Sequence, residues 1–305
     1  MILFSRNENM KGTLTTPHEV IDTPILVFGL SDVDMLDIIQ EVSESFLLDT
    51  DTIKVLENEI ECCTMLAESY PLHYLLSTDK SIFLESHRKS VKEAKNELLS
   101  YQDTVFADVI ITPPSQDPVL KDDDFAADFI HAIPSFNLEN WTEKVKENRD
   151  VEIEKARMIV FRGSIKDLER IQSLEIDPKK CLIFEPTDQY LDYYHRLTEI
   201  NLDGFIFPNF GRLCRDGFVI VTETAEDELP LYNISDAFHS QDANPLAKKC
   251  CCSVCSATNK IFVAKMLKIC PAKGANFLLK HNIFQIRQIF ARKLNGKIEL
   301  KSENQ

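Results

Sequence analysis

The chain has 305 residues, 44% of them hydrophobic and 9% aromatic, which is enough apolar material for a sizeable core. Its formal net charge of −15 argues against nucleic acid binding by the molecule as a whole. No run of 18 apolar residues is present to cross a membrane, and the segment Met1–Glu8 becomes charged too early for a secretory signal peptide. We therefore expect a cytoplasmic protein.

The charge is unevenly distributed along the chain. From Lys248 to Gln305 there are twelve Lys and Arg against two Glu, a local charge of +10, so the rest carries −25. Such an asymmetry fits an anionic partner for the basic segment. A solvated helical face that balances an acidic body explains it equally well.

The first elements form an irregular series. Residues 11–30 predict a short β element, a turn and a buried strand at Ile25–Phe28, and Ser31 is a good N-cap for a following helix. The stretch 49–76 is ambiguous. Ser77 or Thr78 predicts the start of a long polar helix that runs to about Ser100.

The middle of the chain is the least regular part. A strand is expected at Val105–Ile111, closed by two prolines. The stretch 115–150 contains an acidic run and the single tryptophan. We assign this stretch no function, because an acidic run is usually a solvated loop.

A repeat becomes visible from residue 156 onward. Apolar strands at Met158–Phe161, Leu182–Phe184 and Phe205–Phe207 recur about every 23–24 residues, with Ser164 and Thr187 as caps of the helices between them. This pattern is typical of βα units around a buried parallel sheet. A (β/α)₈ barrel fits better than an open sheet, because no Gly-rich phosphate loop follows the first strand.

The C-terminal third predicts a strand and two helices. The strand is expected at Gly217–Glu223, and the helices at Lys260–Ile269, ended by Pro271, and at about Ala275–Leu294. A broad apolar face runs along the second helix. The cysteine-rich loop lies between the strand and the first helix.

That loop contains the strongest chemical signal of the chain. Cys250, Cys252 and Cys255 form a C-x-C-x-x-C pattern, and His281 follows 26 residues after the last cysteine. Three thiolates and an imidazole are the ligand set of a closed structural zinc site. Unrelated cysteines, or a redox or disulfide cluster, are the alternatives. A close thiol cluster in a chain without an export signal favours one structural Zn²⁺. Of the adjacent cysteines, we expect Cys251 to be the one that does not bind the metal.

These residues also resemble a known family. The run Asn244–Cys255 with His281-Asn282 is similar to the metal signature of the tRNA-guanine transglycosylase family, and Gly12–Pro24 is similar to its opening. The resemblance implies an α/β fold: a TIM-like (β/α)₈ barrel, partly trimmed in its middle, with a C-terminal zinc-binding helical subdomain. We expect one domain over residues 1–305, with the zinc-binding region at 244–294.

The catalytic residues of that family are not matched. Its members exchange the wobble guanine of certain tRNAs with one aspartate as nucleophile and a second as general base. The nucleophile position, four residues before Pro208, holds Gly204, and the neighbouring Asp203 would point to the opposite face of the strand. The Asp-Ser-Gly-Gly motif of the second aspartate is absent, since the chain has no Gly-Gly pair among its eight glycines. We expect no catalytic residue.

The resemblance therefore extends to the family's non-catalytic accessory subunit. It implies a heterodimer with the catalytic queuine tRNA-ribosyltransferase subunit. The complex would exchange guanine for queuine in tRNAs with GUN anticodons, those for aspartate, asparagine, histidine and tyrosine. Family members also suggest a peripheral location at the mitochondrial outer membrane.

Two other functions remain open. The chain could be an active transglycosylase that uses a displaced carboxylate, with Asp203, Asp108 or Glu185 as the candidates. Alternatively, the basic C-terminal part could be a zinc-stabilised module that binds RNA or protein. The acidic remainder of the chain would then be unrelated to the family.

Overall fold

The computed structural model divides into two compact units. The barrel unit comprises Met1–Ser31, Met35–Asp188 and Leu202–Pro208, and the C-terminal unit comprises Asp32–Asp34, Gln189–Asn201 and Asn209–Gln305. The predicted zinc-binding region 244–294 lies inside the second. The structure describes residues 3–6, 12–31, 45–55, 80, 82–86, 91–102, 105, 107–112, 132–138, 156–172, 174, 176–187, 202–222 and 231–302.

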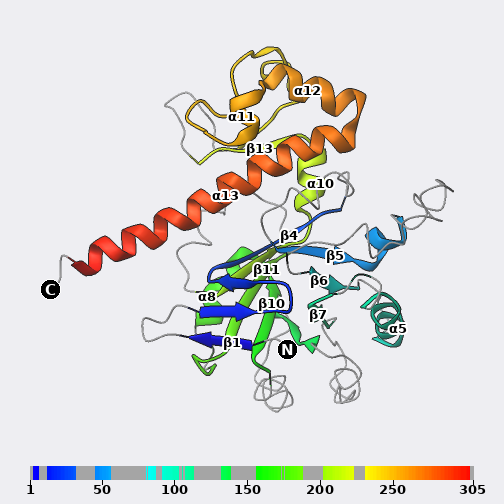
Figure 1. The fold of residues 1–305 in the computed structure, drawn as a ribbon, viewed down its shortest axis with the longest axis vertical. Helices are drawn as coiled ribbons and strands as arrows, with labels where there is room; N and C mark the ends of the chain where they lie inside the picture. Colours follow the sequence, from blue (N-terminus) through cyan, green and yellow to red (C-terminus); the bar gives the residue numbers. More distant parts are fainter. Residues whose placement is uncertain are drawn as a thin grey trace. The chain divides into compact units, whose positions relative to one another are not determined.

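A parallel sheet forms the body of the barrel unit (Figure 1). The strands are short, and those whose burial the structure describes are almost wholly buried, as expected of strands covered on both faces. In ring order the strands are β4 (Ile25–Gly29), β5 (Ser45–Asp49), β6 (Ile82–Glu85), β7 (Val109–Ile111), β8 (Ala132–Ile133), β9 (Ser135–Asn137), β10 (Met158–Gly163), β11 (Cys181–Pro186) and β12 (Gly204–Phe207), and β12 pairs back with β4.

The ring is completed at Pro134. β8 pairs with β7 and β9 pairs with β10, and only Pro134 separates these two short strands. Proline cannot donate to a ladder, so the strand is interrupted there, while its carbonyl oxygen accepts a hydrogen bond from the Val160 N–H at 3.0 Å. Counting residues 132–137 as one strand gives eight parallel strands. The expected (β/α)₈-like fold is confirmed at this level, and the expected trimming does not reduce the number of strands.

Helices connect successive strands where the structure describes the connections. Helix α5 (Val91–Gln102) lies between β6 and β7, and η2 (Ile165–Asp167) with α8 (Leu168–Gln172) lies between β10 and β11. Ser164 is the N-cap of η2, in a capping box with Asp167, as its position predicted.

The inside of the barrel is an apolar core built from alternate residues of the strands. On β10 and β11 the buried inward positions are Met158, Val160, Cys181 and Ile183. This register also places the last inward position of each of these strands at the carboxyl end, where ligands bind in (β/α)₈ barrels.

A small antiparallel sheet covers the amino-terminal end of the barrel. It consists of β1 (Leu3–Arg6), β2 (Gly12–Thr15) and β3 (Val20–Asp22), in that order. Phe4 and Leu14 of this sheet join the core cluster, and Arg6 contacts the carbonyl oxygen of Lys180, just before β11. The β element predicted near the N-terminus therefore closes the bottom of the barrel.

Two predictions were wrong in their extent, one of a helix and one of a strand. Residues 82–85 form strand β6 rather than the first part of a long helix, and α5 begins only at Val91. The run Ile-Phe-Leu-Glu is fully buried between β5 and β7, and this tertiary pairing overrides the capping signals at Ser77 and Thr78. The strand expected over Val105–Ile111 is limited to β7. The helices predicted after Ser31 and Thr187 lie outside the described residues.

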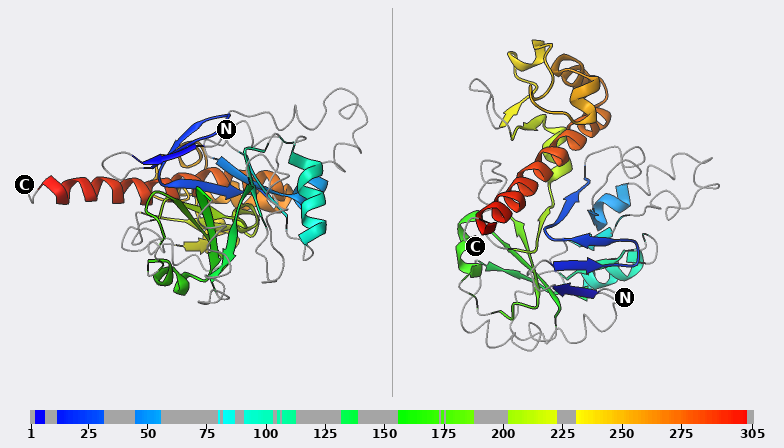
Figure 2. Two further views of the ribbon diagram at one scale, coloured as in Figure 1. Left: turned by 90° about the horizontal axis from the view of Figure 1, so that it is seen from below. Right: turned by 60° about the vertical axis from the view of Figure 1, so that its left-hand side comes forward.

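The C-terminal unit is a helical assembly with one small hairpin. Its long helix α13 packs against α10, α11, α12 and β13 (Figure 2). The elements are α10 (Phe210–Arg215), β13 (Phe218–Ile220), β14 (Leu231–Asn233), η4 (His239–Gln241), α11 (Ser253–Ala257), α12 (Lys260–Ile269) and α13 (Pro271–Ser302).

The two predicted C-terminal helices are present. α12 has the predicted bounds, whereas α13 begins at Pro271 because proline fits the first turn of a helix, where its missing N–H is not needed. Among the described residues, no helix is long and apolar enough to cross a membrane.

Candidate metal centre

The cysteine loop folds around its own sulfur atoms. Cys252 is the N-cap of α11, and its Sγ accepts a hydrogen bond from the Cys255 N–H at 3.3 Å. Cys250 Sγ accepts one from the Cys252 N–H at 3.4 Å. Because the first turn of α11 starts at the second cysteine, the C-x-C-x-x-C spacing turns all three sulfurs toward one point.

His281 meets this point from α13. Its side chain is fully buried, and Nδ1 lies 3.7 Å from Cys250 Sγ and 3.4 Å from each of the other two sulfurs. The four atoms all lie within 4.8 Å of one another. The four residues predicted as ligands therefore come together, and Cys251 is exposed outside the cluster.

The spacing fits one tetrahedral metal ion. With metal–sulfur bonds of about 2.3 Å and a metal–nitrogen bond of about 2.0 Å, a tetrahedron has sulfur–nitrogen edges of about 3.5 Å. The observed 3.4–3.7 Å brackets this value. The cluster is thus close enough to bind one metal ion through three thiolates and an imidazole.

The histidine is held in the tautomer that metal binding requires. Its Nε2 lies 3.0 Å from the carbonyl oxygen of Ile220 on β13. A carbonyl only accepts, so Nε2 carries the proton and the lone pair of Nδ1 faces the sulfurs.

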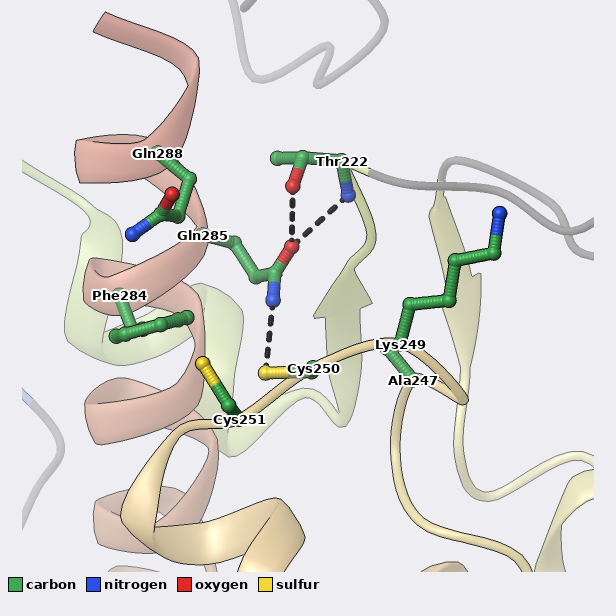
Figure 3. A pocket seen from close by; sticks show the side chains of 8 residues that line it. All are labelled: Thr222, Ala247, Lys249, Cys250, Cys251, Phe284, Gln285 and Gln288. Atoms are coloured by element: carbon green, nitrogen blue, oxygen red, sulfur yellow. Dashed lines mark hydrogen bonds between the residues drawn. The ribbon is translucent and has the colours of Figure 1, made fainter. Parts of the chain in front are cut away.

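Asn282 and Gln285, on the same helix, complete the surroundings. Asn282 is fully buried; its Oδ1 accepts from the Ile220 N–H at 2.9 Å and its Nδ2 donates to the Phe218 carbonyl oxygen at 2.9 Å. Gln285 Nε2 donates to Cys250 Sγ at 3.0 Å (Figure 3). Both residues tie α13 to the site.

Gln285 was not predicted as a site residue from the sequence. Its position four residues after His281, on the same face of a helix, was the available signal.

The thiols perturb one another strongly. Hydrogen bonding with the side chains of Cys250 and Cys255 lowers the pKa of Cys252 to about 3. Hydrogen bonding with the side chains of Cys250 and Cys252 raises the pKa of Cys255. Because thiolates rather than thiols bind metal, metal binding by this cluster releases protons.

The candidate carboxylates of the displaced-acid alternative do not converge. Asp203 precedes β12 and Asp108 precedes β7, so both lie at the amino-terminal end of the barrel. Asp203 accepts from Arg6 at 2.7 Å and from the Leu182 N–H at 2.8 Å, but burial outweighs these contacts and raises its pKa. Asp108 is held by His18 Nδ1 at 2.8 Å.

Glu185 is the one candidate at the carboxyl ends of the strands. It occupies the inward register of β11, and its Oε2 accepts from Arg162 Nε at 2.8 Å. Arg162 also contacts Glu85 of β6 across the barrel. Burial lowers the pKa of Arg162, but the carboxylates of Glu185 and Glu85 outweigh it and raise the pKa above its usual value. Arg162, Glu185 and Glu85 thus form an ion cluster at the carboxyl-terminal end of the barrel core, which was not predicted from the sequence.

Gly204 begins β12. A Cβ there would lie 2.7 Å from the backbone oxygen of Ile25 and 2.9 Å from its Cβ. A side chain is therefore excluded unless β4 moves away.

No family model matches the chain, and a comparison with curated proteins finds no match either. The candidate site is accordingly defined by geometry alone: a buried Cys₃His cluster, joined to β13 and α13 by His281, Asn282 and Gln285, and suited to one metal ion.

Proposed function

We propose that the chain is a zinc-bound, non-catalytic accessory subunit of a queuine tRNA-ribosyltransferase. The single observation that carries the proposal is the Cys₃His cluster, which joins the loop 250–255 to α13 with the spacing of the transglycosylase signature. Zinc is the proposed metal because tetrahedral sites of thiolates and imidazole select it. Its role is structural, since four protein ligands leave no open position for a substrate.

The barrel supports the non-catalytic part of the proposal. Gly204 packs against Ile25 with no space for an aspartate side chain. Asp203 and Asp108 lie at the end of the barrel opposite the one where barrel enzymes act. A base-exchange reaction needs a nucleophile and a base near one ribose, and these residues do not offer that arrangement.

A surface of α12 supports the subunit part of the proposal. Phe262, Met266 and Ile269 follow helical spacing, and Phe262 and Ile269 are 44% and 78% exposed. Lys265 and Lys268, also exposed, lie beside this apolar stripe. An exposed apolar stripe with a basic border is suited to a protein partner with apolar and acidic side chains.

Co-elution with the catalytic subunit in size-exclusion chromatography tests the subunit claim. We expect a one-to-one complex for the unaltered chain and a complex weakened at least about tenfold for Ile269→Glu, because a charge is placed in the apolar stripe. Val55→Glu is the matched control, since Val55 is an apolar residue of the barrel unit that is 57% exposed. No complex with the unaltered chain, or equal loss in both variants, contradicts the proposal.

One observation favours the enzyme alternative enough to test it. Glu185 is a carboxylate at the carboxyl end of a barrel strand, although Arg162 engages it. If a covalent RNA adduct forms with the chain alone and is lost in Glu185→Gln, the chain is an active enzyme and not a non-catalytic accessory subunit.

A further inference from the structure

The four candidate ligands are not equally accessible. Cys252 is 5% exposed, Cys255 is 7% exposed and His281 is fully buried, whereas Cys250 is only partly buried. Cys250 also lines a partly open pocket of about 80 Å³, several times the roughly 10–15 Å³ that a single water molecule needs on this measure. Cys250 is thus the most accessible of the four candidate ligands, and it borders an opening large enough for the thiol end of a small molecule.

The cavity lies entirely in the C-terminal unit, with walls from three segments (Figure 3). Thr222 follows β13, Cys250 and Cys251 belong to the cysteine loop, and Gln285 and Gln288 project from α13. In the close view the amino group of Lys249 points away from the Cys250 sulfur. The opening is thus lined by polar and apolar side chains alike, and the charge of Lys249 is directed away from the sulfur.

Gln285 fixes the orientation of the Cys250 side chain. Its Oε1 accepts from Thr222 N–H at 2.9 Å and from the Thr222 hydroxyl at 2.6 Å. These two donors determine which side of the amide is oxygen, so its Nε2 must face Cys250 Sγ at 3.0 Å. An N–H donor stabilises the thiolate charge of Cys250 and restrains its departure from the cluster.

We propose that Cys250 is the exchangeable ligand of this metal centre and that the cavity beside it admits the small thiol that replaces it. In the exchange, the bond from Cys250 Sγ to the metal breaks while a bond from the incoming thiolate forms. The proton of the incoming thiol passes to the released Cys250 thiolate, and no electrons are transferred. The inference goes beyond the accessory role and rests only on the metal centre.

Metal transfer to a chromogenic chelator, followed at increasing 2-mercaptoethanol, tests the exchange. With about one zinc ion bound per chain, we expect the transfer rate to rise in proportion to the thiol concentration. Gln285→Glu keeps an acceptor for Thr222 but removes the N–H donor to Cys250, so it should weaken metal binding about tenfold or more and speed up transfer. Cys270→Ser is the matched control, because Cys270 is a half-buried thiol of the same unit that does not line the cavity.

The order of alkylation gives a second readout that does not depend on a variant that must fold. In the zinc-loaded chain treated with limiting iodoacetamide, Cys251 is exposed and reacts first, and we expect Cys250 to react before Cys252 and Cys255. A transfer rate independent of thiol concentration, or equal labelling of the three ligand cysteines, overturns the proposal. A purified chain that binds no zinc overturns both the metal centre and its exchange, while the partner assay with the catalytic subunit remains a separate test.

Discussion

His281 donates from Nε2 to the backbone carbonyl oxygen of Ile220 at 3.0 Å, and this contact turns Nδ1 toward three cysteine sulfurs. The hydrogen bond joins α13 to the hairpin strand β13 and sets the metal-binding tautomer at the same time. Asn282, the next residue, pairs with the same strand. The His-Asn dipeptide thus has two linked roles: one side chain faces the metal and the other holds the helix in place.

The metal should be lost when its helical ligand is removed. His281→Ala leaves three sulfurs and a buried void, and we expect the metal affinity to fall by more than about 100-fold, beyond the usual effect of outer contacts. Metal content and thermal unfolding of the purified variant measure this. His239→Ala is the control, because His239 belongs to the same unit but not to the cluster. A variant that still holds one ion per chain would refute the ligand assignment.

Asn282 should matter for stability. Replacing it with alanine leaves the Ile220 N–H and the Phe218 carbonyl oxygen buried without this partner, so we expect a loss of about 2–3 kcal/mol in the free energy of unfolding. Asn259→Ala, which removes the N-cap of α12, should cost only about 1 kcal/mol. Chemical denaturation of both variants in the presence of metal compares them; equal losses would contradict the account.

In the ion cluster of Arg162, Glu85 and Glu185, removing the cation alone should cost more stability than removing the cation and both carboxylate charges together. Arg162→Met removes the cation that holds Glu85 and Glu185, and we expect a loss of about 3–5 kcal/mol, because two buried carboxylates remain. Adding Glu85→Gln and Glu185→Gln should recover part of that loss. Arg170→Met is the control, since the exposed Arg170 pairs with Asp167 at the surface and should contribute less than about 1 kcal/mol. A single variant as stable as the original chain would show that Arg162 does not hold the cluster together.

Acid should weaken one contact of the C-terminal unit. The hydrogen bond from Lys260 to Asp242, at 2.8 Å, lowers the pKa of Asp242 below its usual value. A carboxyl with a lowered folded pKa adds stability above its unfolded pKa and loses it as the pH falls through the folded pKa. The stability difference between Asp242→Asn and the original chain should therefore be present at neutral pH and shrink below about pH 4. Melting temperatures measured across this range test it, and a difference that stays constant down to pH 2 would rule out the linkage.

The parts predicted from the sequence are those with local signals. The spacing of Cys250, Cys252 and Cys255 requires only one helical turn, and the strands from Met158 onward are short apolar runs between capped helices. Strand β6 was misread because its four residues owe their state to pairing with β5 and β7. The segment that completes the ring, 132–137, is defined by partners more than 20 residues away on either side.

Contacts that join distant segments of the chain could not be predicted from the sequence either. Gln285 and Thr222 are 63 residues apart, and Arg162 and Glu85 are 77 apart. No local pattern connects such residues. Their meeting depends on the complete packing of each unit.

Exchange of labelled guanine for queuine in a tRNA with a GUN anticodon tests the central claim most directly. The assay compares this chain alone, the catalytic subunit alone and the two together, each loaded with zinc. The account predicts no exchange by this chain alone and a rate for the mixture well above that of the catalytic subunit alone. Full exchange by this chain alone, or a mixture no faster than the catalytic subunit, would contradict it.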